Sequence, residues 1–391
     1  MRRNLPTIPA DEYRERWNRV QKLMEEKNLD LFFAYADDRA AFGPAHARWL
    51  ANFPVHFEVA GVFMVKGKDP ILVSGPESEG YAKLVGSIEN VRVIEEFTHP
   101  YVDFMHATLE SATEVVSDLI DLKKIKRIGI AGAPLMGAYA YRDFQEAFAG
   151  AEWVDVEYDV CMLRAIKSPA ELAVIRHAYH VAQRAFEVGV DAIKDGAFER
   201  EVAAAVEYTI RMAGGEGTGI DTMVGSGENA RDVITRTSLR QMKSGEFVHL
   251  TVAPRYEGYH GAIARPIFIG EPNKEALVAL LAAERAHKAG YAALKPGIEG
   301  RVVEGITREI MHAEGLEKYY QHSGMHSIGV MEFEPPFFGP TQDSVFAEGM
   351  VVSIDVPVFE TPWGGFRVED GYEITATGAE RLNLVDYLII K

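Results

Sequence analysis

The pattern of apolar residues changes near residue 159, and this change constrains the fold more than any other feature of the chain. Before it, short apolar runs such as Leu29–Tyr35 and Ile128–Ile130 alternate with helical patterns such as Asp11–Lys27. Buried strands that alternate with amphipathic helices are typical of an α/β layer domain. Residues 1–158 are therefore expected to form an α/β domain.

The second half of the chain, residues 159–391, begins with a long helix and continues mainly in strands. Ser168 precedes Pro169, and Glu171 follows the serine by three residues, which is the capping-box signature of a helix start. Further helices are expected at Glu199–Met212, Lys274–Ala293 and Val302–Glu314, and strands near 247–253, 259–269, 326–333, 349–359 and 365–377. This half is therefore expected to be a second domain, built on strands and helices.

Composition narrows the range of partners. The 41 Lys and Arg residues against 58 Asp and Glu residues give a net charge of −17, which repels phosphate backbones and anionic lipid surfaces. Nucleic acid and membranes are therefore not expected as partners. The single cysteine, Cys161, excludes an intramolecular disulfide and a multi-thiolate metal site. Because neither a signal peptide nor an apolar run of about 18 residues is recognisable, we expect a cytoplasmic protein.

Two histidines lie on a hairpin with the sequence FVHLTVAPRYEGYHGAIARPIFIG. Side chains alternate between the two faces of a strand, so His249 and Thr251 share one face of the first strand. By the same argument His260 and Ala262 share one face of the second strand. The two imidazoles are therefore expected to line one site, although a hydrogen-bonded structural role is the alternative for each.

A second group of polar residues lies in the segment QHSGMHSIGVMEFEPP, which contains His322, His326, Glu332 and Glu334. On a helix, histidines four residues apart can clamp a metal ion. Gly324 and Gly329 disfavour a continuous helix here, so a metal clamp is not the preferred interpretation.

The third group lies near the C-terminus, where Asp355 interrupts the apolar run Met350–Val358. Burying a lone carboxylate costs several kcal/mol unless it is paired, so Asp355 needs a partner. Arg367 and Glu369 alternate onto one face of the next strand, and either Arg367 or a ligand is expected to be that partner. A structural salt bridge is the alternative to a functional role.

Several motifs resemble those of the creatinase/prolidase/aminopeptidase P family. The motifs are MLRAIKSPAELAVIRHA, VGSGENA, MKSGEFVHLTV, YEGYHGAIARPIFIG, LKPG, HSGMHSIG, EGMVVSID and GGFRVEDGYEIT, in that order. The resemblance implies an α+β fold, in which an N-terminal α/β creatinase-like domain (1–158) precedes a C-terminal pita-bread catalytic domain (159–391). It also implies a homodimer.

The expected metal ligands are where this sequence departs from the family. Metal-dependent members are expected to use two Asp, one His and two Glu, a set suited to two divalent ions. The resemblance places these five positions on Thr251, Ala262, His326, Asp355 and Glu369. Other family positions fall on Phe333 for a second histidine, near Ile234 for a loop histidine, and on Ala264 for the extra glutamate of creatinase. Neither a metal ion nor another cofactor is therefore expected.

These departures favour a metal-independent, creatinase-like hydrolase or lyase that cleaves a C–N bond in a small polar nitrogenous compound by acid–base catalysis. The expected catalytic residues are His326 as general base, His260 as second proton carrier, and Asp355 and Glu369. The expected substrate-binding residues are Arg367, His249, Thr251, Glu334 and His322. Two alternatives remain open: a single-metal Xaa-Pro peptidase-like hydrolase using His260, His326, Asp355 and Glu369, and a catalytically silent homologue that binds a ligand.

Overall fold

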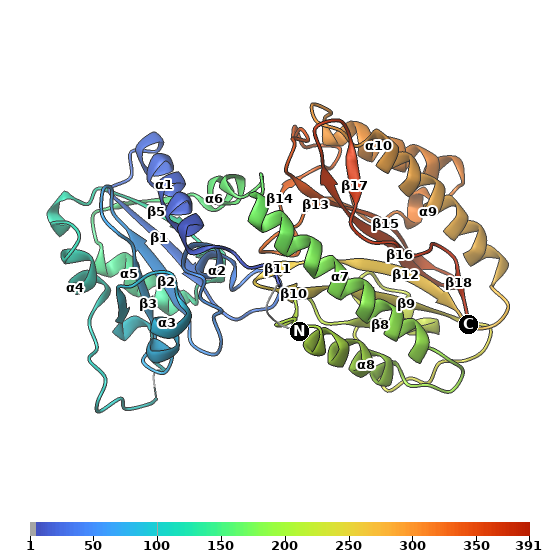
Figure 1. Ribbon diagram of the computed structural model, residues 1–391, viewed down its shortest axis with the longest axis horizontal. Coiled ribbons are helices and arrows are strands. Elements are labelled where there is room, and N and C mark those ends of the chain that lie inside the picture. The colour runs from blue at the N-terminus through green and yellow to red at the C-terminus, as the bar shows by residue number, and fades with distance from the viewer. Residues whose placement is uncertain (1–4, 100) are drawn as a thin grey trace. The chain divides into compact units, whose positions relative to one another are not determined.

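A computed structural model describes residues 5–99 and 101–391 (Figure 1). Residues 1–4, on which the signal-peptide expectation partly rests, lie outside the described residues. The described chain forms two compact units, one of residues 8–164 and one of residues 165–391 together with residues 5–7. The division falls after Arg164 rather than after residue 158, because helix α6 (Glu157–Leu163) contacts α1 and β5 of the first unit.

The N-terminal unit is built on a six-stranded mixed sheet in the order β4-β3-β2-β1-β5-β6. Its strands are β1 (Leu31–Ala36), β2 (Ala60–Met64), β3 (Ile71–Ser74), β4 (Val91–Val93), β5 (Arg127–Ala131) and β6 (Glu152–Asp155). Its other helices are α1 (Ala10–Glu26), α2 (Ala45–Ala51), α3 (Glu79–Val85), α4 (Ala112–Ser117) and α5 (Ala138–Ala147). The ring of Phe33 stacks on Phe63 and Phe144 with centroid distances of 4.6 and 4.8 Å, so strands and helix α5 share one core.

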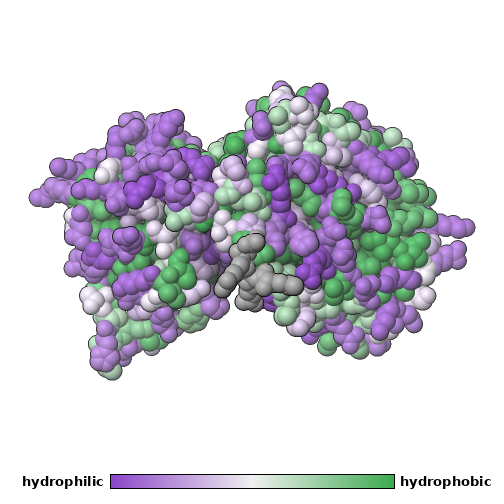
Figure 2. All heavy atoms as spheres, in the orientation of Figure 1, coloured by the Kyte–Doolittle hydropathy of each residue, from purple (hydrophilic) through white to green (hydrophobic). Residues whose placement is uncertain are grey.

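Helix α1 shows how the sequence pattern produces this layering. Its buried residues recur at helical spacing and form one stripe, which consists of the apolar Tyr13, Val20, Leu23 and Met24 and the fully buried Arg16. The remaining positions are mostly charged, and Figure 2 shows hydrophilic side chains over this helix. The helix therefore packs one face inward and keeps the other in water.

The C-terminal unit contains a nine-stranded sheet and a three-stranded sheet. The path of the large sheet is β14-β13-β15-β16-β12-β9-β8, with β17 beside β16 and β18 beside β12, and the small sheet is β11-β10-β7. The strands are β7 (Gly217–Thr218), β8 (Met223–Ser226), β9 (Phe247–Val252), β10 (Pro254–Tyr256), β11 (Tyr259–His260), β12 (Ile263–Phe268), β13 (Met325–Ser327), β14 (Glu334–Phe337), β15 (Val351–Thr361), β16 (Gly364–Ile374), β17 (Ala379–Arg381) and β18 (Ile389–Ile390).

Four long helices cover this unit: α7 (Pro169–Ala192), α8 (Glu199–Met212), α9 (Lys274–Ala293) and α10 (Gly300–Ala313). The ranges expected for α8 and α9 are confirmed, and Ser168 and Glu171 form the predicted capping box of α7. Helices α7 and α8 lie along the β8–β9 part of the sheet, while α9 and α10 lie along the β15–β16 part (Figure 1).

A narrow seam joins the two halves of the large sheet. Strands β12 and β16 pair in register at one position, Ala264 opposite Glu369. Beside it, the Arg265 Nη2 atom lies 2.8 Å from the Asp370 Oδ1 atom, and both side chains are fully buried. The Arg381 Nη2 atom lies 3.0 Å from Asp370 as well. A buried ion network therefore holds the seam.

The second strand of the hairpin differs from the sequence-based expectation. His260 and Ala262 do not share one strand face, because β11 ends at His260 and β12 begins at Ile263. Between them Gly261 packs against the backbone of α7, where an added Cβ atom would lie 2.9 Å from the Tyr179 nitrogen. This close approach leaves no room for a side chain at position 261, where the chain passes from the small sheet to the large one.

Among the described residues, none of the helices has both the length and the apolar character that crossing a membrane requires.

We predict that Asp370→Asn lowers the free energy of unfolding by about 3–5 kcal/mol at pH 7, because it leaves the buried charge of Arg265 without its partner. Burial alone would raise the pKa of Asp370, but the charges of Arg265 and Arg381 hold it below its usual 3.8. The stabilisation is therefore present above about pH 4 and is lost as the pH falls further. Urea unfolding measures the difference, and the exposed Glu380→Gln is the control. Equal stability of the two variants would show that the Asp370–Arg265 ion pair does not stabilise the fold.

Candidate active site

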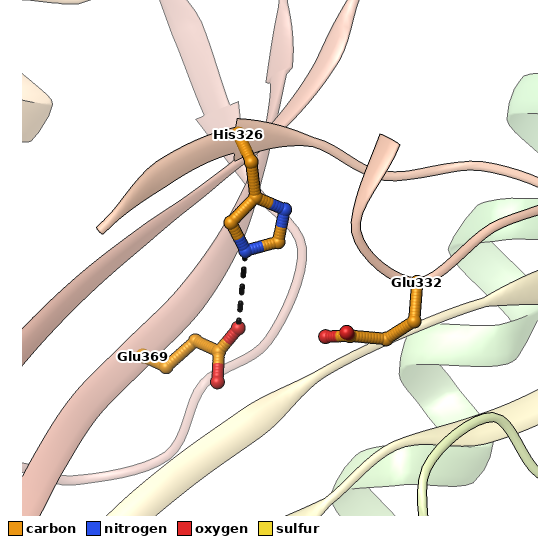
Figure 3. Close-up of side chains that lie close together, drawn as sticks. All are labelled: His326, Glu332 and Glu369. Atoms are coloured by element: carbon orange, nitrogen blue, oxygen red, sulfur yellow. Dashed lines mark ion pairs between the residues drawn. The ribbon is translucent and has the colours of Figure 1, made fainter. Parts of the chain in front are cut away.

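Three buried side chains from separate segments converge on one face of the large sheet. His326 belongs to β13, Glu369 to β16, and Glu332 to the loop 328–333 between β13 and β14. One ligand atom from each side chain lies within 4.8 Å of the others. Figure 3 shows the three groups pointing toward a common space. The structure thus brings together two expected site residues, His326 and Glu369, and adds Glu332.

The imidazole of His326 has a defined tautomer. Its Nδ1 atom lies 3.0 Å from the Ser327 carbonyl oxygen, which only accepts, so Nδ1 carries the hydrogen. The Nε2 atom then presents a lone pair, 3.9 Å from the Glu369 Oε1 atom. Burial lowers the pKa of His326 to about 4, so the ring is neutral at pH 7. His326 is therefore poised to accept a proton or to bind a metal ion.

Glu369 lies directly opposite Asp355 in the β15–β16 register. The Ser353 hydroxyl donates a hydrogen bond of 2.9 Å to the Glu369 Oε1 atom. Burial and the charge of Asp355 raise the pKa of Glu369 to about 7, and burial raises the pKa of Asp355 to about 6. Two carboxyl groups therefore share one buried region, where ionising both is costly.

Asp355 has the partner that the sequence requires, since its Oδ2 atom lies 3.3 Å from the Arg367 Nη1 atom. Arg367 also donates a 3.0 Å hydrogen bond from Nη2 to the Val233 carbonyl oxygen. The Arg367 Nε atom and the Asp355 Oδ1 atom are buried without hydrogen-bond partners among the described residues. The pair thus keeps one free donor and one free acceptor.

Glu332 is the site residue that sequence reasoning did not select. It is 7% exposed, and burial together with the charge of Glu369 raises its pKa to about 8. It lies in an irregular loop, where no periodicity indicates its direction. The sequence does show an acidic residue, Glu332, two positions before Glu334. It does not show which of these two glutamates faces the site.

The other expected site residues mostly have partners within the protein. The His249 Nε2 atom lies 2.7 Å from the Thr251 hydroxyl, and the His322 Nδ1 atom lies 3.2 Å from the Ser323 carbonyl oxygen. The Glu334 carboxylate lies 3.3 Å from the Lys167 Nζ atom, and both side chains are almost completely buried. Glu334 therefore anchors the chain rather than facing a substrate.

His260 is also bonded to the backbone rather than to a residue of the cluster. Its Nδ1 atom lies 3.0 Å from the Gly329 carbonyl oxygen, and its ring packs where Gly219 lacks a side chain. Burial and the charge of Arg255 lower the pKa of His260 to about 3. Among the described residues, no hydrogen bond or ion pair joins it to the cluster, and its buried Nε2 atom has no hydrogen-bond partner.

Tyr179 of α7 is a second residue that the sequence did not indicate. Its hydroxyl is completely buried near the backbone N–H group of Ala262, and it donates no hydrogen bond among the described residues. It occupies the space left by Gly371, which shares a strand face with Glu369. Burial and the charge of Glu369 keep its pKa well above 10, so the hydroxyl keeps its proton.

The donor atoms fit one divalent cation better than two. His326, Glu332 and Glu369 offer one nitrogen and two carboxylates, a set typical of such ions. At the two expected Asp positions, Thr251 offers a hydroxyl already bonded to His249, and Ala262 offers no ligand atom. A second ion would therefore find too few negative oxygens.

Comparisons with known proteins agree with this architecture. Residues 173–376 match the model of metallopeptidase family M24, and residues 16–166 match the creatinase/prolidase N-terminal domain. An Xaa-Pro dipeptidase of Pyrococcus furiosus is 29% identical over 374 residues, which cover 94% of this chain and 97% of the relative. An uncharacterised peptidase of Staphylococcus aureus is 34% identical over 58% of this chain and 65% of its own length.

Solved structures show the same fold. The prolidase from Pyrococcus furiosus superposes with a TM-score of 0.79 at 25% identity, covering 94% of this chain and 99% of that one. A recombinant prolidase from Thermococcus sibiricus reaches a TM-score of 0.84 at 19% identity, covering 97% and 98%. The expected α/β domain followed by a pita-bread domain is thereby confirmed.

We predict that Glu332→Gln stabilises the protein after treatment with a chelator, by about 1–2 kcal/mol at pH 8. The substitution removes one of three buried carboxyl groups that face one guanidinium, and so relieves their repulsion. Chemical unfolding in EDTA measures the change, with the exposed Glu348→Gln as the control. A loss of stability in Glu332→Gln would show that Glu332 has a stabilising partner.

Proposed function

Since this chain belongs to metallopeptidase family M24, we propose that it is a hydrolase that cleaves the C–N bond of a small Xaa-Pro-like dipeptide. One observation carries the proposal: His326 and Glu369, on which the family resemblance places two of its ligands, lie together with Glu332 in one buried cluster. The similarity to an Xaa-Pro dipeptidase over nearly the whole chain supports the substrate class.

The Asp355–Arg367 pair supports a zwitterionic substrate. The free Arg367 Nε donor suits a carboxylate, and the free Asp355 Oδ1 acceptor suits an ammonium or imino N–H group. Both groups are buried, so each loses water that a substrate group would replace. A dipeptide carries an ammonium group and a carboxylate group close together, whereas in a long peptide the two groups lie far apart.

A divalent ion held by His326, Glu332 and Glu369 would supply Lewis-acid polarisation of the scissile carbonyl group. The chain's own residues orient the substrate and stabilise the negative charge that develops in the transition state. Arg367 and Asp355 fix the ends of the substrate, and the Tyr179 hydroxyl donates a hydrogen bond to the oxygen on which negative charge develops. Ser353 holds Glu369 in place. The buried surroundings strengthen each of these interactions.

A metal-independent reaction, the main expectation from the sequence, is the second candidate. The observation in its favour is the neutral His326, whose Nε2 lone pair faces the carboxyl groups. In this mechanism His326 takes a proton from water, and a protonated carboxyl group donates one to the leaving nitrogen. The family comparisons favour the metal-assisted alternative.

We also propose that the protein is a cytoplasmic homodimer, on the strength of the family resemblance and the composition. Light scattering of the purified protein and fractionation of cells that express it would test these two points. A monomeric mass would contradict the first, and recovery outside the cytoplasm the second.

We predict that the protein hydrolyses Xaa-Pro dipeptides faster than N-methylated or guanidino compounds, and that His326→Ala lowers kcat/KM by about 100-fold or more. His46→Ala is the matched control, because His46 is also a buried histidine but belongs to helix α2 of the N-terminal unit. Its turnover per folded molecule should stay within a few-fold of the parent. A screen followed by initial rates, normalised to folded protein, measures both. If the effects are reversed, the site assignment is wrong.

We predict that Tyr179→Phe lowers kcat by about 10–100-fold and leaves KM nearly unchanged, because the lost hydrogen bond forms only in the transition state. Stability should change little, since the removed hydroxyl is buried and donates no hydrogen bond among the described residues. Steady-state kinetics and thermal unfolding separate the two effects. Unchanged kcat would remove Tyr179 from the mechanism.

A further inference from the structure

We propose that His326, Glu332 and Glu369 form a one-metal centre, which replaces the two-metal centre expected for metal-dependent members of the family. Glu332 is an additional ligand, because the resemblance places none of the five expected ligands on it. The inference deepens the proposed function, since it concerns the same site, but its test does not depend on turnover.

The local charge calls for one divalent cation. Three buried carboxyl groups, Glu332, Asp355 and Glu369, face the single guanidinium of Arg367, which leaves two negative charges when all are ionised. Buried carboxylates without compensation are costly. One divalent ion balances this excess, whereas two ions would leave the region positive.

The Glu332 side chain is directed into the site without a partner of its own. It is 7% exposed, and no hydrogen bond or ion pair to it is found among the described residues. Its carboxylate nevertheless points toward His326 and Glu369 (Figure 3). A buried acidic group without a partner is expected to bind a ligand or to be protonated.

The loop that carries Glu332 is anchored on both sides. Before it, the Gly329 carbonyl oxygen accepts 2.9 and 3.0 Å hydrogen bonds from the backbone nitrogen and the Nδ1 atom of His260. After it, Glu334 pairs with the buried Lys167. Glu332 is therefore held near the two strand residues, as a preorganised ligand needs to be.

The distances permit joint coordination. Nitrogen and carboxylate ligands lie roughly 2.0–2.2 Å from a transition-metal ion, so two ligands of one ion are at most about 4.4 Å apart. The observed limit of 4.8 Å is close to that value, and small side-chain rotations close the difference. The His326 Nε2 lone pair already faces this space.

A second ion has no comparable set of ligands. The Thr251 hydroxyl is bonded to His249, Ala262 has no donor atom, and Asp355 is paired with Arg367. The guanidinium of Arg367 also repels a cation on that side of the site.

The test measures binding without substrate. The full-length protein is stripped with EDTA and dialysed against Mn²⁺, Co²⁺ or Zn²⁺, and bound metal is counted by mass spectrometry. We expect one equivalent per chain for at least one of these ions, and a visible absorption spectrum of the Co²⁺ form. Glu332→Gln should weaken binding at least tenfold, and the exposed Glu348→Gln should not. The double variant Thr251→Asp/Ala262→Asp should gain a second equivalent.

Three outcomes overturn the proposal. No bound metal removes the centre and leaves the metal-independent mechanism. Two equivalents in the parent protein show that another residue replaces the lost Asp ligands. One equivalent that is insensitive to Glu332→Gln removes Glu332 from the ligand set. Circular dichroism of each variant confirms folding. Failure of the proposed function would appear instead as a metal-loaded protein that turns over no dipeptide.

Discussion

The seam between β12 and β16 is the constraint on which the catalytic unit depends. One register pair, Ala264 opposite Glu369, connects the strands under α7 and α8 to the strands under α9 and α10. Successive side chains on a strand point to opposite faces, so Asp370 meets Arg265 on one face while Glu369 enters the site on the other. The ion pair thus fixes the register that places a reactive carboxyl group.

The site shows how a fold can keep its architecture while its chemistry shifts. Two positions expected to hold Asp carry Thr251 and Ala262, and the acidic side chain of Glu332 enters from a loop instead. Fewer buried carboxyl groups therefore lie near His326 than the four expected for metal-dependent members of the family, but some remain. Arg367 then faces a smaller negative charge, part of which it neutralises through Asp355.

Local signals in the sequence predicted the elements, and long-range contacts decided the site. The helices α7, α8 and α9 follow from caps and apolar spacing, and the need of Asp355 for a partner follows from its apolar neighbours. His260 was misplaced because the sequence does not reveal that one strand ends at His260 and the next begins at Ile263, beside the contact of Gly261 with α7. Glu334 was assigned to substrate because its partner, Lys167, is distant in sequence. Glu332 was missed because loop residues carry no periodicity.

The residue at position 179 limits which residues position 371 can hold. A methyl group at position 371 would overlap the Tyr179 hydroxyl, and the tyrosine cannot withdraw, because its backbone already touches Gly261. Alanine at 371 is therefore tolerated only after position 179 has become smaller. In a combinatorial library the residues selected at the two positions should therefore covary. Once a smaller residue has replaced Tyr179, position 371 should accept side chains that the tyrosine now excludes.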